Sequence, residues 1–292
     1  MRSETAAIGP LAPFLLNRNM TALVLLFWLS ALATYLLDVP RHWKALLLLG
    51  LGLITAAIFR SEHGTSKIAL LGAAASFGLA LLSLRIARRL MVAGWIATVL
   101  LVVPMASLAY TKQLYLAASW LPYSARHRIV IWGYTSDQIA KAPVLGAGIS
   151  TARALNDRDD EHPVLAPGST FRLTTGWHSH NAYLQAWYET GAVGALLLLG
   201  IGLLAIRALA SARADVQPFL YATFVSGALM AGSSFSLWAP WFVASLCLAA
   251  VFAALLSELA SRQGRRADAE FSQAPPVQVD QPISAAGDGG PV

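Results

Sequence analysis

Long apolar runs separated by short polar segments make up most of the chain. The runs cover approximately residues 20–37, 43–59, 67–84, 90–109, 192–212, 217–236 and 238–258. Each approaches the roughly 20 residues that a helix needs to cross the hydrocarbon core of a bilayer. Because the runs are continuous rather than alternating, they favour helices over strands. The pattern therefore predicts an all-α, polytopic transmembrane bundle of about seven spans.

Three segments fall outside the predicted spans. Residues 1–19 form a short N-terminal extramembrane segment, and residues 110–191 form a large extramembrane loop. Residues 259–292 are rich in Pro, Gly, Ala and polar side chains, which is typical of a disordered tail. The spans themselves occupy residues 20–109 and 192–258.

The large loop is too long to lack secondary structure inside a compact domain. We expect one helix near residues 124–141, ended by Pro143, with turns at Gly146 and Gly148. A second helix should begin near residues 178–181 and continue into the span at 192–212. Its first N–H groups and the positive end of its dipole would then be free to face an anion.

Composition agrees with a membrane protein. The chain is 57% hydrophobic and 12% charged, with a mean hydropathy of +0.58. Its net charge of +6 comes from Lys and Arg scattered between apolar runs, which is typical of residues that set membrane orientation and gives no nucleic-acid signal. The single cysteine, Cys247, excludes a disulfide within the chain.

The basic clusters predict an orientation. The positive-inside rule places three arginine groups on the cytoplasmic side: those at residues 85–89, 207–213 and 262–266. The C-terminus is then cytoplasmic, while the N-terminus and the 110–191 loop are outside. Four cations remain on the outer side as candidates for a function: Arg60, Lys67, Arg126 and Arg128.

The stretch at residues 178–194, HSHNAYLQAWYETGAVG, concentrates polar chemistry at the entrance of an apolar run. Ionisable side chains at a membrane boundary are costly and are usually functional. His180, Asn181 and Glu189 stand here beside Gly191 and Gly194, which we expect to permit close helix packing.

Three motifs in this chain resemble those of the O-antigen ligase and polymerase superfamily. The first is Thr65-Ser66-Lys67-Ile-Ala-Leu-Leu, and the second is Arg128-x-x-x-Trp132 followed by Pro143 and Leu145-Gly146-Ala-Gly148. The third is His180-Asn181, Tyr183-Leu184-Gln185 and Glu189-x-Gly191-x-x-Gly194. The resemblance covers about residues 45–258. Family members usually have more spans, so the chain is similar to the C-terminal portion of the usual enzyme.

The resemblance implies a glycosyltransferase of cell-surface polysaccharide assembly. Such an enzyme moves a glycan from an undecaprenyl-diphosphate carrier to an acceptor hydroxyl at the periplasmic face of the bacterial inner membrane, without a metal or other cofactor. The partners would be the lipid-linked donor, membrane lipid and a lipid A-core or glycan acceptor. The resemblance leaves O-antigen ligase, polymerase and protein O-oligosaccharyltransferase open.

The resemblance also assigns roles to residues. His180 and Arg128 would be catalytic, because an imidazole can take a proton from the acceptor hydroxyl and a guanidinium can stabilise the departing diphosphate. Lys67 would bind the diphosphate together with Arg128, and Arg126 and Arg60 are further candidates that are also readable as boundary charges. The topology independently places Lys67, Arg128 and His180 on one side of the membrane.

Three neighbours are expected to support this chemistry without taking part in it. His178 and Asn181 flank His180, and Glu189 would fix the junction between the loop and the helix through hydrogen bonds. The nearby tryptophans fit an interfacial aromatic belt better than a set of sugar-stacking platforms.

Other classes of function fit less well. The acidic run at residues 157–162, even with His178 and His180, matches no tight metal-ligand spacing, so we expect no metal site. A transporter would need charged residues in the middle of its spans, and these are essentially absent. A non-catalytic or accessory membrane fragment that needs a partner chain remains the alternative of a different class.

Overall fold

The computed structural model describes residues 13–156, 163–165, 171–233 and 235–273. Within them, apart from one isolated bridge between Val164 and Arg172, the regular structure is helical. The helices are α1 (Pro13–Leu36), α2 (Arg41–Arg60), α3 (Gly64–Leu82), α4 (Leu84–Thr111), α5 (Leu114–Ala117), α6 (Tyr123–Ile139), α7 (Thr151–Asn156), α8 (Ala182–Ala210), α9 (Gln217–Ser233) and α10 (Pro240–Gln273). The all-α prediction is confirmed.

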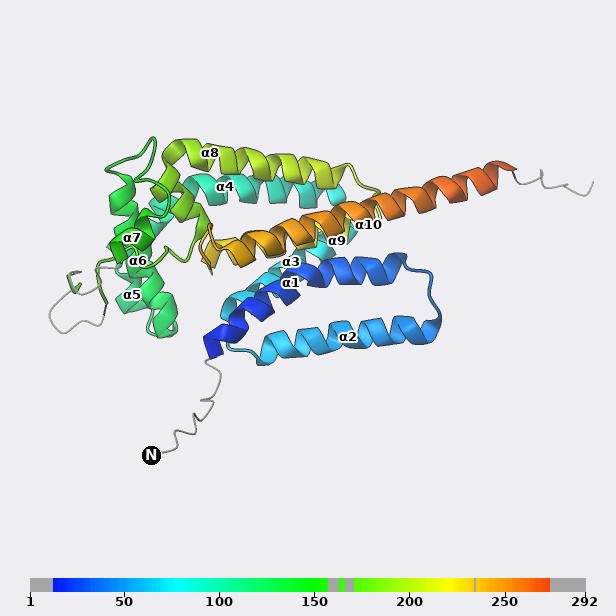
Figure 1. Cartoon of the computed structure of the whole chain (residues 1–292), viewed down its shortest axis with the longest axis horizontal. Coiled ribbons are helices and arrows are strands. Elements are labelled where there is room, and N and C mark those ends of the chain that lie inside the picture. Colours follow the sequence, from blue (N-terminus) through cyan, green and yellow to red (C-terminus); the bar gives the residue numbers. More distant parts are fainter. Residues whose placement is uncertain (1–12, 157–162, 166–170, 234, 274–292) are drawn as a thin grey trace, which may run out of the picture.

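Seven long helices run side by side, and α5, α6 and α7 gather at one end of the bundle (Figure 1). Six of the described helices are long and apolar enough to cross a membrane: α1, α2, α3, α4, α8 and α10. The predicted span at 217–236 corresponds to α9, which has only 17 residues. Each predicted span therefore coincides with a helix, although α9 is shorter than the usual crossing length.

The C-terminal tail departs from the prediction in its first part. We expected disorder from residue 259, but α10 continues to Gln273. Ion pairs on the helix surface join Glu258 to Arg262 at 2.8 Å and to Arg265 at 3.2 Å. Helix-forming residues such as Ala, Arg, Gln and Glu, the absence of proline and such ion pairs allow the helix to continue beyond its apolar run. Residues 274–292 lie outside the described part of the chain.

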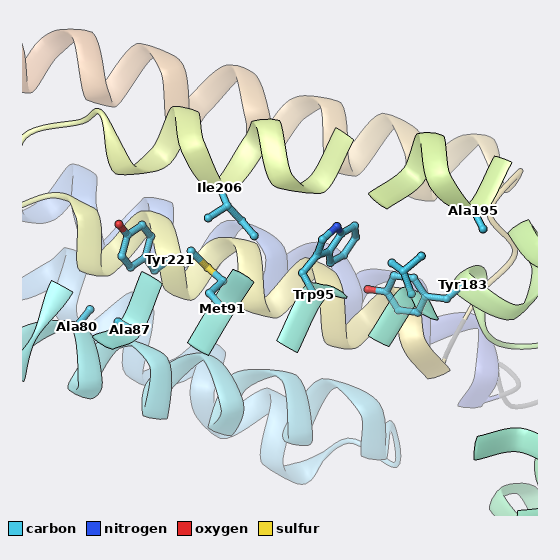
Figure 2. Close-up of a cluster of buried hydrophobic side chains, with 9 residues drawn as sticks. Ala80, Ala87, Met91, Trp95, Tyr183, Ala195, Ile206 and Tyr221 are labelled. Carbon is cyan, nitrogen blue, oxygen red and sulfur yellow. The ribbon is translucent and has the colours of Figure 1, made fainter. Parts of the chain in front are cut away.

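Trp95 on α4 stands at the centre of the largest buried cluster (Figure 2). Its ring packs edge-on against Tyr183 of α8, with ring centres 5.5 Å apart, and against Phe224 of α9. Its indole N–H donates to the carbonyl of Leu199 at 3.0 Å. Gly202 makes this approach possible, because a Cβ there would overlap the indole ring. One aromatic side chain thus fixes the distances among three helices.

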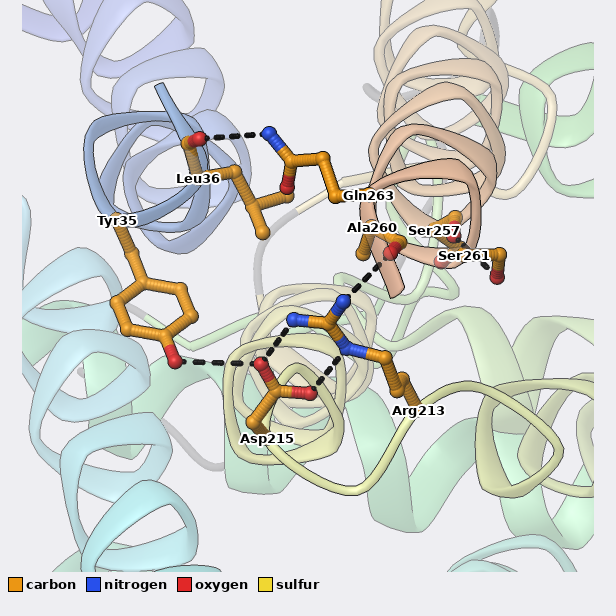
Figure 3. A network of polar contacts seen from close by, with 8 residues as sticks. All are labelled: Tyr35, Leu36, Arg213, Asp215, Ser257, Ala260, Ser261 and Gln263. Atoms are coloured by element: carbon orange, nitrogen blue, oxygen red, sulfur yellow. Dashed lines mark hydrogen bonds and ion pairs between the residues drawn. The ribbon is translucent and has the colours of Figure 1, made fainter. Parts of the chain in front are cut away.

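A polar network closes the end of the bundle opposite α5–α7 (Figure 3). Arg213, in the turn between α8 and α9, pairs with Asp215 at 2.5 Å and donates to the carbonyl of Ala260 in α10 at 2.6 Å. The Tyr35 hydroxyl donates to the same aspartate at 3.2 Å. Gln263 donates to the carbonyl of Leu36 at 3.0 Å, so α10 is also tied to the end of α1.

Gly191 interrupts α8 and opens it to a neighbouring loop. Its φ of 61° and ψ of −160° are non-helical, so carbonyls and N–H groups on either side of it lack helix partners. The carbonyl of Tyr188 accepts from the N–H of Ala147 at 2.8 Å, and the N–H of Ala192 donates to Pro143 at 2.9 Å. The glycine serves a backbone-to-backbone junction rather than the helix–helix packing that we expected.

We predict that Gly191→Ala lowers the free energy of unfolding by about 2 kcal/mol, because the residue has a positive φ and a Cβ would overlap the Val144 carbonyl. The measurement is Tm in detergent micelles. Gly200→Ala is the matched control, since it lies in the same helix with open space around its Cα. A Tm for Gly191→Ala equal to that of the control would contradict the junction.

Candidate functional site

A cavity of about 620 Å³ lies at the α5–α7 end of the bundle. Its walls come from the start of α1, the α2–α3 loop, α6, α7, the start of α8 and the α9–α10 loop. The lining residues are Asn17, Arg18, His63, Arg128, Ser150, Arg153, Trp177, His178, His180, Gln185, Glu189, Phe235, Ser236, Trp238, Ala239, Pro240 and Trp241.

The segment that carries the two neighbouring histidines is held at both ends. Asn181 caps α8, and its Oδ1 accepts from the N–H groups of Tyr183 and Leu184 at 3.1 Å each. The indole of Trp132 on α6 donates to the carbonyl of Ser179 at 2.7 Å. We expected these first N–H groups of the helix to be free for an anion. That expectation is wrong for Tyr183 and Leu184, because the cap occupies both.

His180 has a φ of 53°, in the left-handed region that few non-glycine residues adopt. Its backbone N–H donates to Nδ1 of His178 at 3.1 Å, and the two imidazole rings lie 4.2 Å apart. Since Nδ1 of His178 is an acceptor, that ring is neutral with its proton on Nε2. The fold therefore stabilises a strained backbone conformation at His180, and this residue lines the cavity.

Arg128 faces the cavity from α6. Burial lowers the pKa of its guanidinium, as expected of a cation removed from water. Among the described residues its side chain makes no hydrogen bond or ion pair. A guanidinium in this environment can donate paired hydrogen bonds to an anion.

Two histidines near Arg128 are held neutral. His63 is buried in the α2–α3 loop, with Nδ1 2.7 Å from Oγ of Ser66. Burial, with a smaller effect from the positive charge of Arg128, lowers the pKa of His63 to about 4. The same two causes, in the same order, lower the pKa of His178 to about 4. Both rings are therefore uncharged near pH 7.

Glu189 is buried, with 1% of its surface exposed, and accepts hydrogen bonds from three segments. Gln185 donates to Oε1 at 3.2 Å, the N–H of Ser150 donates to Oε2 at 2.9 Å, and the indole of Trp238 donates to Oε2 as well. Gln185 also donates to Oγ of Ser236 at 3.1 Å. The carboxylate thus joins the loop after Pro143, α8 and the α9–α10 loop around the cavity.

The cavity brings together four of the residues that the sequence singled out: Arg128, His178, His180 and Glu189. Asn181 stands behind them as a helix cap. The other three predicted diphosphate ligands do not line the cavity, namely Lys67, Arg126 and Arg60. Their role in binding stays a prediction.

Comparison with known proteins identifies the family to which this chain belongs. A family model described as O-antigen ligase matches residues 49–199, just over half of the chain. The chain belongs to the O-antigen ligase family. The matched region contains Arg128, His178, His180 and Glu189.

Curated relatives of the chain include proteins of Rickettsia conorii, Rickettsia bellii and Rickettsia typhi, all named as candidate polysaccharide ligases. They are 25%, 26% and 24% identical to it over 123 residues, which is 42% of this chain. The matched stretch spans only 29% of the first relative and 30% of the other two. No solved structure matches the chain significantly.

Several residues that line the cavity of this O-antigen ligase family member were not predicted from the sequence. Arg18 and Trp238 lie outside the region that the family model matches, at the two ends of the chain, and only the packing of α1 against α10 brings them together. Arg153 lies on the short helix α7, outside the motifs quoted above. His63 could have been predicted from the sequence, because it lies two residues before the Thr65-Ser66-Lys67 motif.

The described residues include no group of three or more His, Cys, Asp or Glu side chains that could hold a metal ion. The acidic run at 157–162 lies outside the described part of this O-antigen ligase family chain.

We predict that acid weakens the fold partly through His178. Its folded pKa is about 4, below the ordinary 6.5, so between these values the unfolded chain binds a proton that the folded chain does not. Stability should therefore fall as pH drops from about 7 toward 4. His178→Asn keeps an acceptor for the His180 N–H without titrating, and its Tm should depend less steeply on pH. Parallel Tm–pH curves for the two proteins would contradict the assignment.

Proposed function

We propose that the chain is a metal-independent glycosyltransferase that moves a glycan from an undecaprenyl-diphosphate carrier to an acceptor hydroxyl, with ligation to lipid A-core as the reaction. The cavity would open to the periplasmic side of the bacterial inner membrane, and the C-terminus would be cytoplasmic. Membership of the O-antigen ligase family supports the reaction class, and the basic clusters support the orientation.

The observation that carries the proposal is the guanidinium of Arg128, which lines the cavity and has no hydrogen-bond or ion-pair partner among the described residues. Breaking a bond between a sugar and a diphosphate transfers negative charge to the departing phosphate oxygens. A partly desolvated cation aimed at those oxygens stabilises the charge where it develops. Glu189, the only acidic residue among the described cavity lining, accepts hydrogen bonds from three donors and forms no ion pair with Arg128.

His180 is the proposed partner for the acceptor. It lines the same cavity as Arg128, and its strained backbone is held by His178 and by the Asn181 cap. In the neutral form its imidazole takes the proton of the acceptor hydroxyl as the oxygen attacks the anomeric carbon. The bond from the anomeric carbon to the phosphate oxygen then breaks, and the diphosphate leaves with the electron pair.

An apolar groove of about 360 Å³ next to the cavity suits the lipid part of the donor. It runs along α8, α9 and α10 and is lined almost wholly by aliphatic and aromatic side chains. Consecutive residues of the α9–α10 loop line the two spaces, with Leu237 in the groove and Ser236 and Trp238 in the cavity. A diphosphate in the cavity would place its polyprenyl chain along the groove.

Polymerase and protein O-oligosaccharyltransferase activities use the same donor chemistry and stay as alternatives within the family. They differ only in the acceptor. A non-catalytic membrane fragment is the alternative of another class, and it predicts no transfer at all by the purified chain.

We predict that His180→Gly lowers the transfer rate by about 100-fold. Glycine removes the imidazole and accepts the positive φ, so the backbone is not strained as it would be in His180→Ala. Arg128→Gln should cause a similar loss through weaker stabilisation of the leaving group. The assays are lipopolysaccharide ladders in a ligase-null bacterium and transfer by purified protein from a labelled lipid-diphosphate glycan.

The control for this series is the Tm of each variant in detergent micelles, which should stay near that of the unmodified chain. Full transfer by folded His180→Gly would remove the catalytic role of this histidine. If the unmodified chain inserts into membranes yet transfers no glycan to any offered acceptor, the fragment alternative replaces the enzyme.

We also predict that Ala250→Phe raises the KM for a donor with a long polyprenyl chain, because the larger ring occupies the groove that Ala250 lines. The KM for a donor with a two-isoprene chain should change little. Val251→Phe is the matched control, since Val251 is exposed on the same helix outside the groove. An equal rise for long and short donors would place the lipid chain elsewhere.

A further inference from the structure

The wall of the cavity formed by the α9–α10 loop carries an aromatic side chain with a fixed orientation. The indole N–H of Trp238 donates to the buried carboxylate of Glu189, and its backbone N–H donates to Oγ of Ser236 at 3.2 Å. The side chain nevertheless remains 40% exposed and lines the cavity. A rigid, half-exposed indole presents an apolar surface of the kind on which the C–H face of a pyranose packs.

The guanidinium of Arg18 lies over the next tryptophan of the same wall, Trp241. The Cζ of Arg18 lies 5.6 Å from the ring centre of Trp241, which itself packs edge-on against Phe235 at 4.5 Å. Stacking on the indole orients the planar group without occupying its N–H donors. Arg18 makes no hydrogen bond or ion pair within the described ranges of the chain, and it lines the cavity.

The Arg18 cation is separate from the Arg128 cation proposed for the diphosphate. Arg128 lies on α6, and its positive charge contributes to lowering the pKa of His63 and His178, whereas Arg18 lies on α1 and stacks on Trp241 of α10. The cavity therefore carries one cation beside the histidines and another beside Trp241.

We propose that Trp238 and Arg18 form a subsite for a pyranose that carries a carboxylate or a phosphate. The sugar face packs on the indole of Trp238, and the anionic substituent accepts paired N–H bonds from Arg18. This inference rests on the proposed glycan transfer and names the class of sugar that the cavity selects. Both residues lie outside the region matched by the family model.

The test uses the full chain in nanodiscs of phosphatidylcholine, with three probes: methyl glucoside, methyl glucuronide and methyl glucoside 6-phosphate. Dissociation constants come from saturation-transfer NMR titrations. We expect at least one anionic probe to bind roughly ten-fold more tightly than methyl glucoside. The carboxylate and phosphate probes show which anion the site prefers.

Variants separate this subsite from the rest of the cavity. Arg18→Gln should bring the affinities of the anionic and neutral probes to the same value and leave methyl glucoside binding unchanged. Trp238→Leu should weaken the binding of all three probes. Arg153→Gln removes an equal charge from the same cavity and should preserve the preference. Arg128→Gln should lose inorganic pyrophosphate binding while keeping the preference, so the two proposals can fail separately.

Equal binding of charged and neutral probes by the unmodified chain would overturn the subsite. So would a preference that survives Arg18→Gln, or one that Arg153→Gln abolishes to the same extent. Arg18→Lys keeps the positive charge but lacks the planar guanidinium, so it should retain only part of the preference for anionic probes.

Discussion

The buried carboxylate of Glu189 is the constraint on which the functional end of the molecule depends. A charge with 1% exposure is costly unless donors saturate it, and here the donors come from Ser150, Gln185 and Trp238. These three groups belong to the loop after α6, to α8 and to the α9–α10 loop. Satisfying one carboxylate therefore assembles three segments that are distant in sequence, and the cavity is the space between them.

Glu189 also contributes to the distribution of charge around the cavity. Its carboxylate accepts three hydrogen bonds from neutral groups, and among the described residues it forms no ion pair with Arg128. Burial and the Arg128 charge keep His63 and His178 neutral, which limits the repulsion among the cations. The cavity therefore combines arginine side chains with two neutral imidazoles, which agrees with the diphosphate donor proposed above.

The remainder of the bundle holds this end in place. Trp95 sets the spacing of α4, α8 and α9, and the Arg213–Asp215 pair fastens the opposite end. Between the two ends the helices are mainly apolar, and hydrogen bonds such as the one from Trp95 to the carbonyl of Leu199 join them. The break at Gly191 is the point at which the membrane helix α8 becomes part of the site.

The sequence by itself determined the helical class, the positions of the long helices and the family, because long apolar runs and short motifs are local properties. It also pointed to Arg128, His180 and Glu189, which lie in motifs. Only the tertiary structure decided that Lys67 lies outside the cavity lining and that Arg18 and Trp238 lie within it. The periodicity of a helix shows on which face a residue lies, but it does not show which distant segment packs against that face. The contacts of α1 with α10, and of the Gly191 break with the loop at Pro143, arise from packing among elements that no local pattern encodes.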